Sequence, residues 1–270
     1  MQPPLDQLME VVEASPAMVA AQDRAGWVSL FAPDGIIEDP VGAGPHLRAG
    51  PGGEDQLGLF WDTFIAGTDI RFEVARDGRH DLAIGRDVTI HTRFASGFTL
   101  QVPAYVIYEL DEGADGLLVT RLAAHWSLRR MVVKVLLGGP LAWWSMTLLS
   151  LRLLANQRLR GILGYLKALT RGVFGRGEAA AVALGRAVAA KDEAALGALL
   201  ADTSPAREAL VDLAQLRVSN PIACGQTVAA RIDFAREGEP QTGVALFTFD
   251  DDRRIRTATL FVAEADASRT

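Results

Sequence analysis

The sequence predicts an α+β protein made of two tandem cone-shaped domains, in which helices cover a curved antiparallel sheet, joined by an apolar, basic helical segment. Three observations lead to this expectation. The length of 270 residues corresponds to about two domains at roughly 150 residues each. A helix followed by alternating apolar strands occurs on both sides of the chain's middle, and residues 127–176 contain no acidic residue. We therefore expect domains at 1–126 and 177–270, with an insertion at 127–176.

Composition places the chain among ordinary globular proteins, with 49% hydrophobic and 22% charged residues. A single cysteine, Cys224, excludes an internal disulfide and indicates a reducing compartment. Asp6 and Glu10 stand where a secretory signal would be basic and then apolar, so a cytoplasmic location is expected. Four histidines without metal-binding spacing, and no glycine-rich phosphate loop, predict neither a metal nor a cofactor.

Charge is unevenly distributed along the chain. The net charge is −11 over residues 1–126, +9 over 127–176 and −4 over 177–270, which together give −6. Neither flanking part has a basic face with interleaved aromatic residues, and the basic middle is strongly apolar. Nucleic acid is therefore not an expected partner.

The first domain is expected to begin with helices and to end in a meander of long antiparallel strands. Strands are predicted over residues 88–97, 100–110 and 117–126, where apolar and polar residues alternate. A strongly curved sheet with helices on one face would enclose an apolar cone. Such a cone is suited to a hydrophobic small molecule.

The second domain repeats this pattern in shortened form. Asp23 aligns with Asp192 at an offset of 169 positions, whereas Asp111 aligns with Asp250 at an offset of 139. The second copy therefore lacks about 30 residues between its helices and its strands, including the counterpart of Asp39. We expect it to be non-catalytic.

The middle segment is predicted to contain a helix from near Pro140 towards Thr170. Proline suits the first turn of a helix because its missing N–H has no partner there. One arc of this helix collects basic and polar residues, and the opposite arc collects Trp and Leu. The members of the basic arc are Arg152, Arg160, Lys167 and Arg171, with Ser145 and Asn156. Two interpretations stay open. In the first, the apolar arc packs between the domains or on a second copy of the chain. In the second, Pro140–Arg171 lies peripherally on the inner face of an anionic membrane.

An acid pair, Glu38 and Asp39, ends an apolar strand just before Pro40 within the segment WVSLFAPDGIIEDPVGAGPH. Burial among apolar neighbours would favour the neutral form of Asp39 and make its carboxylate a stronger base than in water. Glu38 is expected to face the other side of the strand. The alternative is a structural aspartate in a turn before proline.

At these residues the sequence resembles the ketosteroid isomerase and SnoaL-like families of the nuclear-transport-factor-two superfold. The resemblance covers residues 5–127 well and residues 177–265 loosely, and it is carried by Asp23, FAPDGIIEDPVG, LFW at 59–61 and AHWS at 124–127. It implies a steroid delta-isomerase-like enzyme in which Asp39 moves a proton on a sterol- or polyketide-like substrate. The superfold also hosts epoxide hydrolases, cyclases and non-catalytic binders, so a lipid carrier is the alternative.

The two hydrogen-bond donors of the family's oxyanion hole are absent, because their positions hold Ser15 and Val106. Tyr108, two residues from Val106 on the same strand face, and His91 on a neighbouring strand are the candidate replacements. The catalytic set is thus Asp39, Tyr108 and His91. The expected substrate-binding residues are Phe31, Trp61, Val106, His125 and Trp126.

Overall fold

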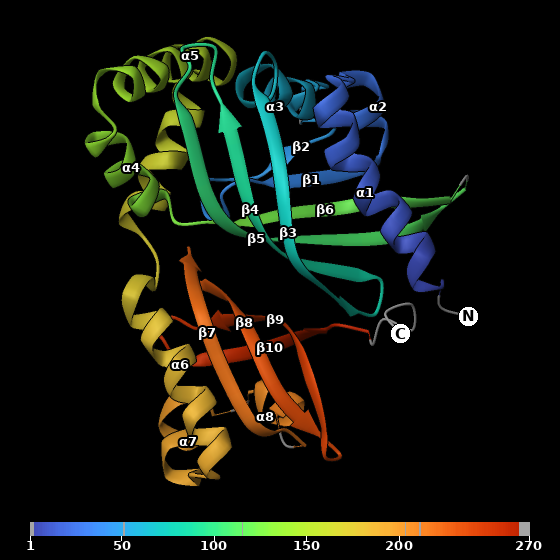
Figure 1. Ribbon diagram of the computed structural model, residues 1–270, viewed down its shortest axis with the longest axis vertical. Coiled ribbons are helices and arrows are strands. Elements are labelled where there is room, and N and C mark those ends of the chain that lie inside the picture. The colour runs from blue at the N-terminus through green and yellow to red at the C-terminus, as the bar shows by residue number, and fades with distance from the viewer. Residues whose placement is uncertain (1–2, 51, 115, 203, 211, 265–270) are drawn as a thin grey trace.

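The computed structural model describes residues 3–50, 52–114, 116–202, 204–210 and 212–264, leaving aside the side chains of residues 158–160. The N-terminal half forms α1 (Leu5–Ala21), α2 (Arg24–Ser29), β1 (Phe31–Glu38), β2 (His46–Leu47), α3 (Gln56–Phe64), β3 (Asp69–His80), β4 (Ala83–Arg93), β5 (Thr99–Gly113) and β6 (Gly116–His125). The meander thus has one strand, β3, beyond those predicted. These elements enclose one apolar core, with the helices on one face of the sheet (Figure 1).

The middle segment is helical, as predicted. It forms α4 (Leu128–Leu137) and α5 (Gly139–Thr170), and Ser127 caps α4 by accepting a hydrogen bond from the Arg130 N–H. Pro140 stands in the first turn of α5, where the sequence placed it. In the described part of the chain, no helix is long and apolar enough to cross a membrane.

The C-terminal half forms α6 (Phe174–Ala190), α7 (Glu193–Leu199), α8 (Ala206–Leu210), β7 (Ala214–Cys224), β8 (Thr227–Arg236), β9 (Glu239–Phe249) and β10 (Ile255–Val262). Helices precede an antiparallel meander, as in the N-terminal half, which supports the α+β prediction. The aligned aspartates have the same role: Asp23 caps α2 and Asp192 caps α7, each accepting a backbone N–H three residues on. That this half is a second copy of one domain stays a prediction.

The strands of the two halves join in one open, curved sheet with the order β2-β1-β6-β5-β4-β3-β10-β9-β8-β7. All neighbours are antiparallel except β1 and β6. The junction is narrow, because β3 meets β10 through the single pair Arg79 and Val262. A third apolar cluster, which includes Tyr105, Ala123 and Phe261, fills the space between the halves. Figure 1 shows α4 and α5 at one end of the molecule's long axis and α7 at the other.

Candidate functional site

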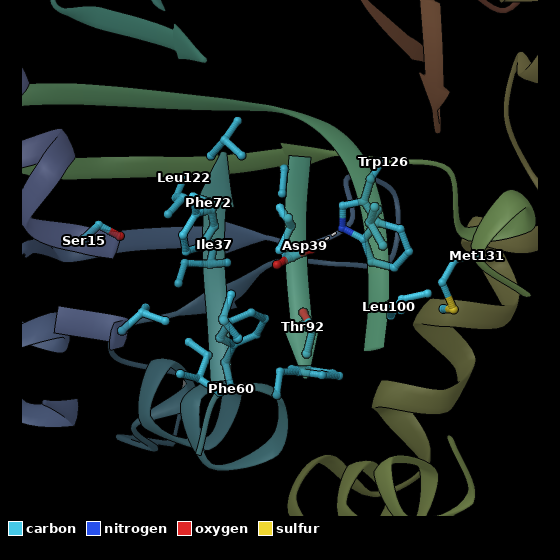
Figure 2. Close-up of a pocket in the computed structure, with 18 of the residues that line it drawn as sticks. Ser15, Ile37, Asp39, Phe60, Phe72, Thr92, Leu100, Leu122, Trp126 and Met131 are labelled. Carbon is cyan, nitrogen blue, oxygen red and sulfur yellow. Dashed lines mark hydrogen bonds between the residues drawn. The ribbon is translucent and has the colours of Figure 1, made fainter. Parts of the chain in front are cut away.

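The main cavity lies in the N-terminal half, between its helices and the concave face of β3–β6. Its volume is about 200 Å³. Apolar side chains from α1, α3 and the sheet form most of its wall, and Met131 of α4 with Met146 and Leu149 of α5 close one side. The polar side chains on the wall are Ser15, Asp39, Thr92, Tyr108, Trp126 and Tyr165. In Figure 2, Ser15 and Met131 lie at opposite ends of the labelled side chains, with Asp39 and Trp126 between them.

Asp39 follows β1 directly, and its half-buried side chain forms part of the cavity wall. Burial among apolar side chains raises the pKa of Asp39 from 3.8 to about 6, and the hydrogen bond that Trp126 Nε1 donates to Oδ1 opposes that rise. The carboxylate is therefore mostly ionised at pH 7 while its pKa stays near the working pH. This balance is what a general base requires.

Tyr165 of α5 holds the backbone at Asp39. Its hydroxyl donates to the Asp39 carbonyl oxygen at 3.1 Å, so α5 is anchored to the loop that carries the carboxylate. Gly164 allows this approach, because a Cβ there would lie 1.9 Å from the Ala43 carbonyl oxygen. The sequence pattern indicates no role for Tyr165 in the site.

A second polar group lies on the cavity wall where α1 meets β5. Ser15 Oγ accepts a hydrogen bond from Trp27 Nε1 at 3.1 Å and is 3.4 Å from the Tyr108 hydroxyl. Only one of the two hydroxyl protons can lie between Ser15 and Tyr108, so the other is available to a bound molecule. Burial raises the pKa of Tyr108, which keeps the phenol protonated and able to donate. The sequence predicts that Ser15 replaces a donor of the family's oxyanion hole and that this donor is lost. In the structure the Ser15 hydroxyl forms a pair with Tyr108.

His91 does not belong to the cavity, contrary to the prediction. Its neighbours Ile90 and Thr92 line the cavity, so strand alternation turns His91 to the other face of β4. There its Nε2 lies 3.0 Å from a carboxylate oxygen of the exposed Glu73. His91 therefore lies on the face of the sheet opposite to the cavity and does not act as an oxyanion donor there.

Three of the five predicted substrate contacts also lie elsewhere. Phe31 and Trp61 pack around Trp27, at ring distances of 5.1 and 5.3 Å, and support the wall from behind. His125 alternates with Ala124 and Trp126, which line the cavity, and is fully buried on the face towards the C-terminal strands. Val106 and Trp126 do line the cavity. The prediction for Glu38 agrees with the structure, because its carboxylate pairs with Arg121 outside the cavity.

A metal centre has no basis among the described residues, since no three of their His, Cys, Asp or Glu side chains cluster closely enough to hold an ion. The polar groups of the cavity include the Asp39 carboxylate, the hydroxyl pair of Ser15 and Tyr108, and the indole N–H of Trp126. This set can accept a proton at one point and donate a hydrogen bond at another.

Residues 12–120 match the family model of the SnoaL-like domain, which confirms the predicted resemblance over that part of the chain. No curated protein matches. Similar solved structures include Rv0760c from Mycobacterium tuberculosis in complex with estradiol-17β-hemisuccinate, at 26% identity over 46% of this chain and 95% of that one, with a TM-score of 0.40. Δ5-3-ketosteroid isomerase from Mycobacterium sp. has the same identity and coverage with a TM-score of 0.38. An LEH-like epoxide hydrolase from M. tuberculosis is 15% identical over 51% of this chain and 100% of that one, with a TM-score of 0.39.

Proposed function

We propose that the N-terminal half is a general-base enzyme acting on a hydrophobic, carbonyl-bearing small molecule, with Asp39 as the base and a sterol- or polyketide-like compound as substrate. The observation that carries the proposal is a carboxylate on the wall of an apolar cavity, where desolvation raises its pKa. Keeping a charge in such a place costs free energy, because the ion loses its hydration. Groups held at that cost are concentrated at functional sites.

The chemistry would be transfer of a proton between two carbons of a conjugated system. Asp39 takes a proton from the carbon next to a carbonyl, and the electron pair of that C–H bond moves to the carbonyl oxygen to form an enolate. The free proton of the Ser15–Tyr108 pair donates a hydrogen bond to the enolate oxygen. Asp39 then returns its proton to another carbon of the enolate, so the double bond moves and nothing is consumed.

The first test measures turnover of a Δ5-3-ketosteroid, the substrate class that the family resemblance suggests, by formation of the conjugated enone. Asp39→Asn keeps the shape of the side chain and removes its basicity. Turnover is expected to fall by about 10²–10⁴-fold, with steroid affinity within a few-fold of the wild type. Exchange of the substrate's α-hydrogens with D₂O, followed by NMR, should be lost in parallel.

Glu38→Gln is the matched control, because it changes the adjacent carboxylate that pairs with Arg121 outside the cavity. It should retain turnover. An Asp39→Asn variant as active as Glu38→Gln would remove Asp39 from the mechanism.

The hydroxyl pair is tested with two tyrosines on opposite faces of β5. Tyr108→Phe leaves Ser15 as the remaining hydroxyl donor on that wall and is expected to lower kcat by up to about 10²–10³-fold. Tyr105→Phe is the control, because the Tyr105 hydroxyl donates to the Asn220 carbonyl oxygen between the two halves. Equal kcat values for the two variants would contradict the assignment of Tyr108.

A carrier without catalysis is the second candidate, and one observation favours it: the Tyr108 hydroxyl already has a partner inside the cavity, in Ser15. A carrier would bind the steroid and neither isomerise it nor exchange its hydrogens. Asp39→Asn would then raise affinity for an apolar ligand, because no charge would have to be kept desolvated. Where turnover is absent, calorimetry of steroid binding to Asp39→Asn distinguishes the two candidates. A raised affinity favours the carrier, and an affinity within a few-fold of the wild type favours the enzyme.

A further inference from the structure

Helices α4 and α5 present an apolar surface to solvent. Among the described residues, every large apolar side chain that is exposed belongs to these two helices, except Val74 on β3. Leu137 is 83% exposed, and the adjacent Trp143 and Trp144 are 52% and 58% exposed. We call the surface formed by Leu136, Leu137, Leu141, Trp143, Trp144 and Leu148 the outer apolar face. A patch of this kind on a water-soluble surface marks a place where something binds.

Three members of the polar arc of α5 contact the protein. Ser145 Oγ lies 2.6 Å from Ser96 Oγ, and Asn156 Nδ2 donates to Thr63 Oγ1 at 3.1 Å. Arg152 donates to the Ala66 carbonyl oxygen at 3.2 Å. A surface helix normally buries its apolar arc and exposes its polar arc. In the part of α5 that carries Trp143 and Trp144, Ser145 faces the protein and the large apolar side chains face solvent, so the outer apolar face does not pack between the two halves. Packing on a second copy stays the alternative from the sequence.

The basic charge of residues 127–176 indicates which kind of partner binds the outer apolar face. Residues 127–176 carry nine Lys or Arg and no Asp or Glu, and Lys167 and Arg171 near the end of α5 are exposed. A twofold dimer through this surface would bring two such segments together, and like charges would oppose it. An anionic surface would be attracted instead, and tryptophan is the residue most typical of the boundary between membrane and water.

We propose that the outer apolar face docks peripherally on an anionic phospholipid membrane. Leu137, Trp143 and Trp144 enter the headgroup boundary, and the basic side chains of the segment interact with lipid phosphates. Arg160, part of the predicted basic arc, has a side chain outside the described residues. Docking itself requires nothing of Asp39.

One consequence connects this surface to the cavity and rests on the proposed function. Met131, Met146 and Leu149 line the cavity from the inner side of the same two helices whose outer side is apolar. A docked molecule would have only α4 and α5 between its cavity and the bilayer. A substrate too insoluble to cross water could then pass from lipid to the cavity.

The test is flotation with vesicles of phosphatidylcholine alone or of phosphatidylcholine with phosphatidylglycerol, using the full chain at low salt. The wild type is expected to float with the anionic vesicles and to be released by high salt. Trp143→Glu/Trp144→Glu should lower the partition coefficient at least tenfold, which is about 1.4 kcal/mol. Lys167→Glu/Arg171→Glu should lower it about tenfold or more. Val74→Glu is the matched control, since it alters an exposed apolar residue away from α4 and α5.

Intrinsic fluorescence gives a second readout on the same samples. Of the five tryptophans, Trp27 and Trp61 are buried and Trp126 is half-buried, so a blue shift with vesicles reports on Trp143 and Trp144. Asp39→Asn should float as the wild type does, which separates docking from catalysis.

Three outcomes would overturn the proposal. The first is wild-type protein that stays in the soluble fraction with both vesicles. The second is equal flotation with phosphatidylcholine alone. The third is a stable dimer in solution that dissociates in the Trp143→Glu/Trp144→Glu variant, because a second copy would then cover the face.

Discussion

Trp126 controls the protonation of Asp39, because its indole N–H donates a hydrogen bond to the carboxylate. The bond lowers the pKa of Asp39 against the larger, opposite effect of burial. Trp126→Phe keeps an aromatic ring and removes the donor, so the pKa of Asp39 should rise above about 6. We expect the acidic limb of the kcat/KM profile to move to higher pH.

The pH–rate profile of Tyr165→Phe is the comparison for Trp126→Phe. Tyr165 bonds the backbone carbonyl of Asp39 and leaves the carboxylate alone, so its removal should displace the acidic limb less. A Trp126→Phe profile that coincides with the wild type would mean that the hydrogen bond does not act on the base.

His125 predicts a loss of stability in acid. Burial, with a smaller contribution from Arg121, lowers the pKa of His125 from 6.5 to about 4. The unfolded state therefore binds the proton first, and folding free energy is lost as the pH falls from about 6.5 towards 4, by up to roughly 3 kcal/mol. Urea unfolding at pH 7 and pH 4.5 should show this loss.

Asp39 contributes to the pH dependence of stability with the opposite sign to His125. The same urea measurement must therefore separate the two contributions. Its folded pKa is raised, so its contribution to stability is complete below about 3.8 and is lost as the pH rises through about 6. His125→Gln should therefore remove the acid loss, and Asp39→Asn should enlarge the difference between the two pH values. A wild-type loss that survives in His125→Gln would contradict the role of His125.

The sequence placed Asp39 in the apolar cavity, which it does line, but it also placed His91, Phe31, Trp61 and His125 there, and they lie elsewhere for a physical reason. Alternation along a strand separates its residues into two sets, but it does not say which set faces the cavity. His91 and His125 belong to the outward set of β4 and β6. Choosing between the sets requires the register of the sheet, which nothing in the local pattern provides.

At the scale of elements, the bounds of α5 could be predicted and its orientation could not. Pro140 and the apolar periodicity placed the helix, but the usual rule assigns the apolar arc to the interior. Part of the polar arc contacts the protein here, because Ser96, Thr63 and the Ala66 carbonyl offer it hydrogen bonds. Lys167 and Arg171 of the same arc are exposed. Those partners lie far away in sequence and become visible only in the folded chain.

Gly164 tests whether the position of α5 matters to the site. Gly164→Ala would place a Cβ 1.9 Å from the Ala43 carbonyl oxygen, so the helix or the loop after β1 has to move. We expect a loss of about 1–3 kcal/mol in the free energy of unfolding, together with lower turnover, because Tyr165 would lose its contact with Asp39.

Gly197→Ala is the matched control for Gly164→Ala. Gly197 also lies in a helix, α7, but no atom is within 4 Å of its Cβ position. This change should be neutral or stabilising by up to about 1 kcal/mol. If both variants unfold at the same denaturant concentration and retain turnover, the close approach of α5 is not required.

At the scale of the whole molecule, the two halves are held together by more than one strand pair. Gly78 and Gly85 leave room for Phe261, whose carbonyl oxygen and ring occupy the space that side chains would take. Beside them, Arg231 donates to Asp87 at 2.7 Å and Arg76 pairs with Asp233 at 3.3 Å. The sequence predicted similar halves, but it contained no sign that they would share one sheet.

This junction predicts that the halves unfold together. Phe261→Ala removes a buried ring from the junction cluster and should cost about 3–5 kcal/mol. All five tryptophans lie before residue 145, so fluorescence reports only on the N-terminal half and helix α5, whereas circular dichroism reports on both halves. We expect the two transitions of Phe261→Ala to move together. The same should hold for Phe234→Ala, which is confined to the C-terminal core, because coincident transitions are the mark of one cooperative unit. If fluorescence kept its wild-type midpoint while the circular dichroism signal changed at lower urea, the C-terminal half would be an independent folding unit attached to the N-terminal half.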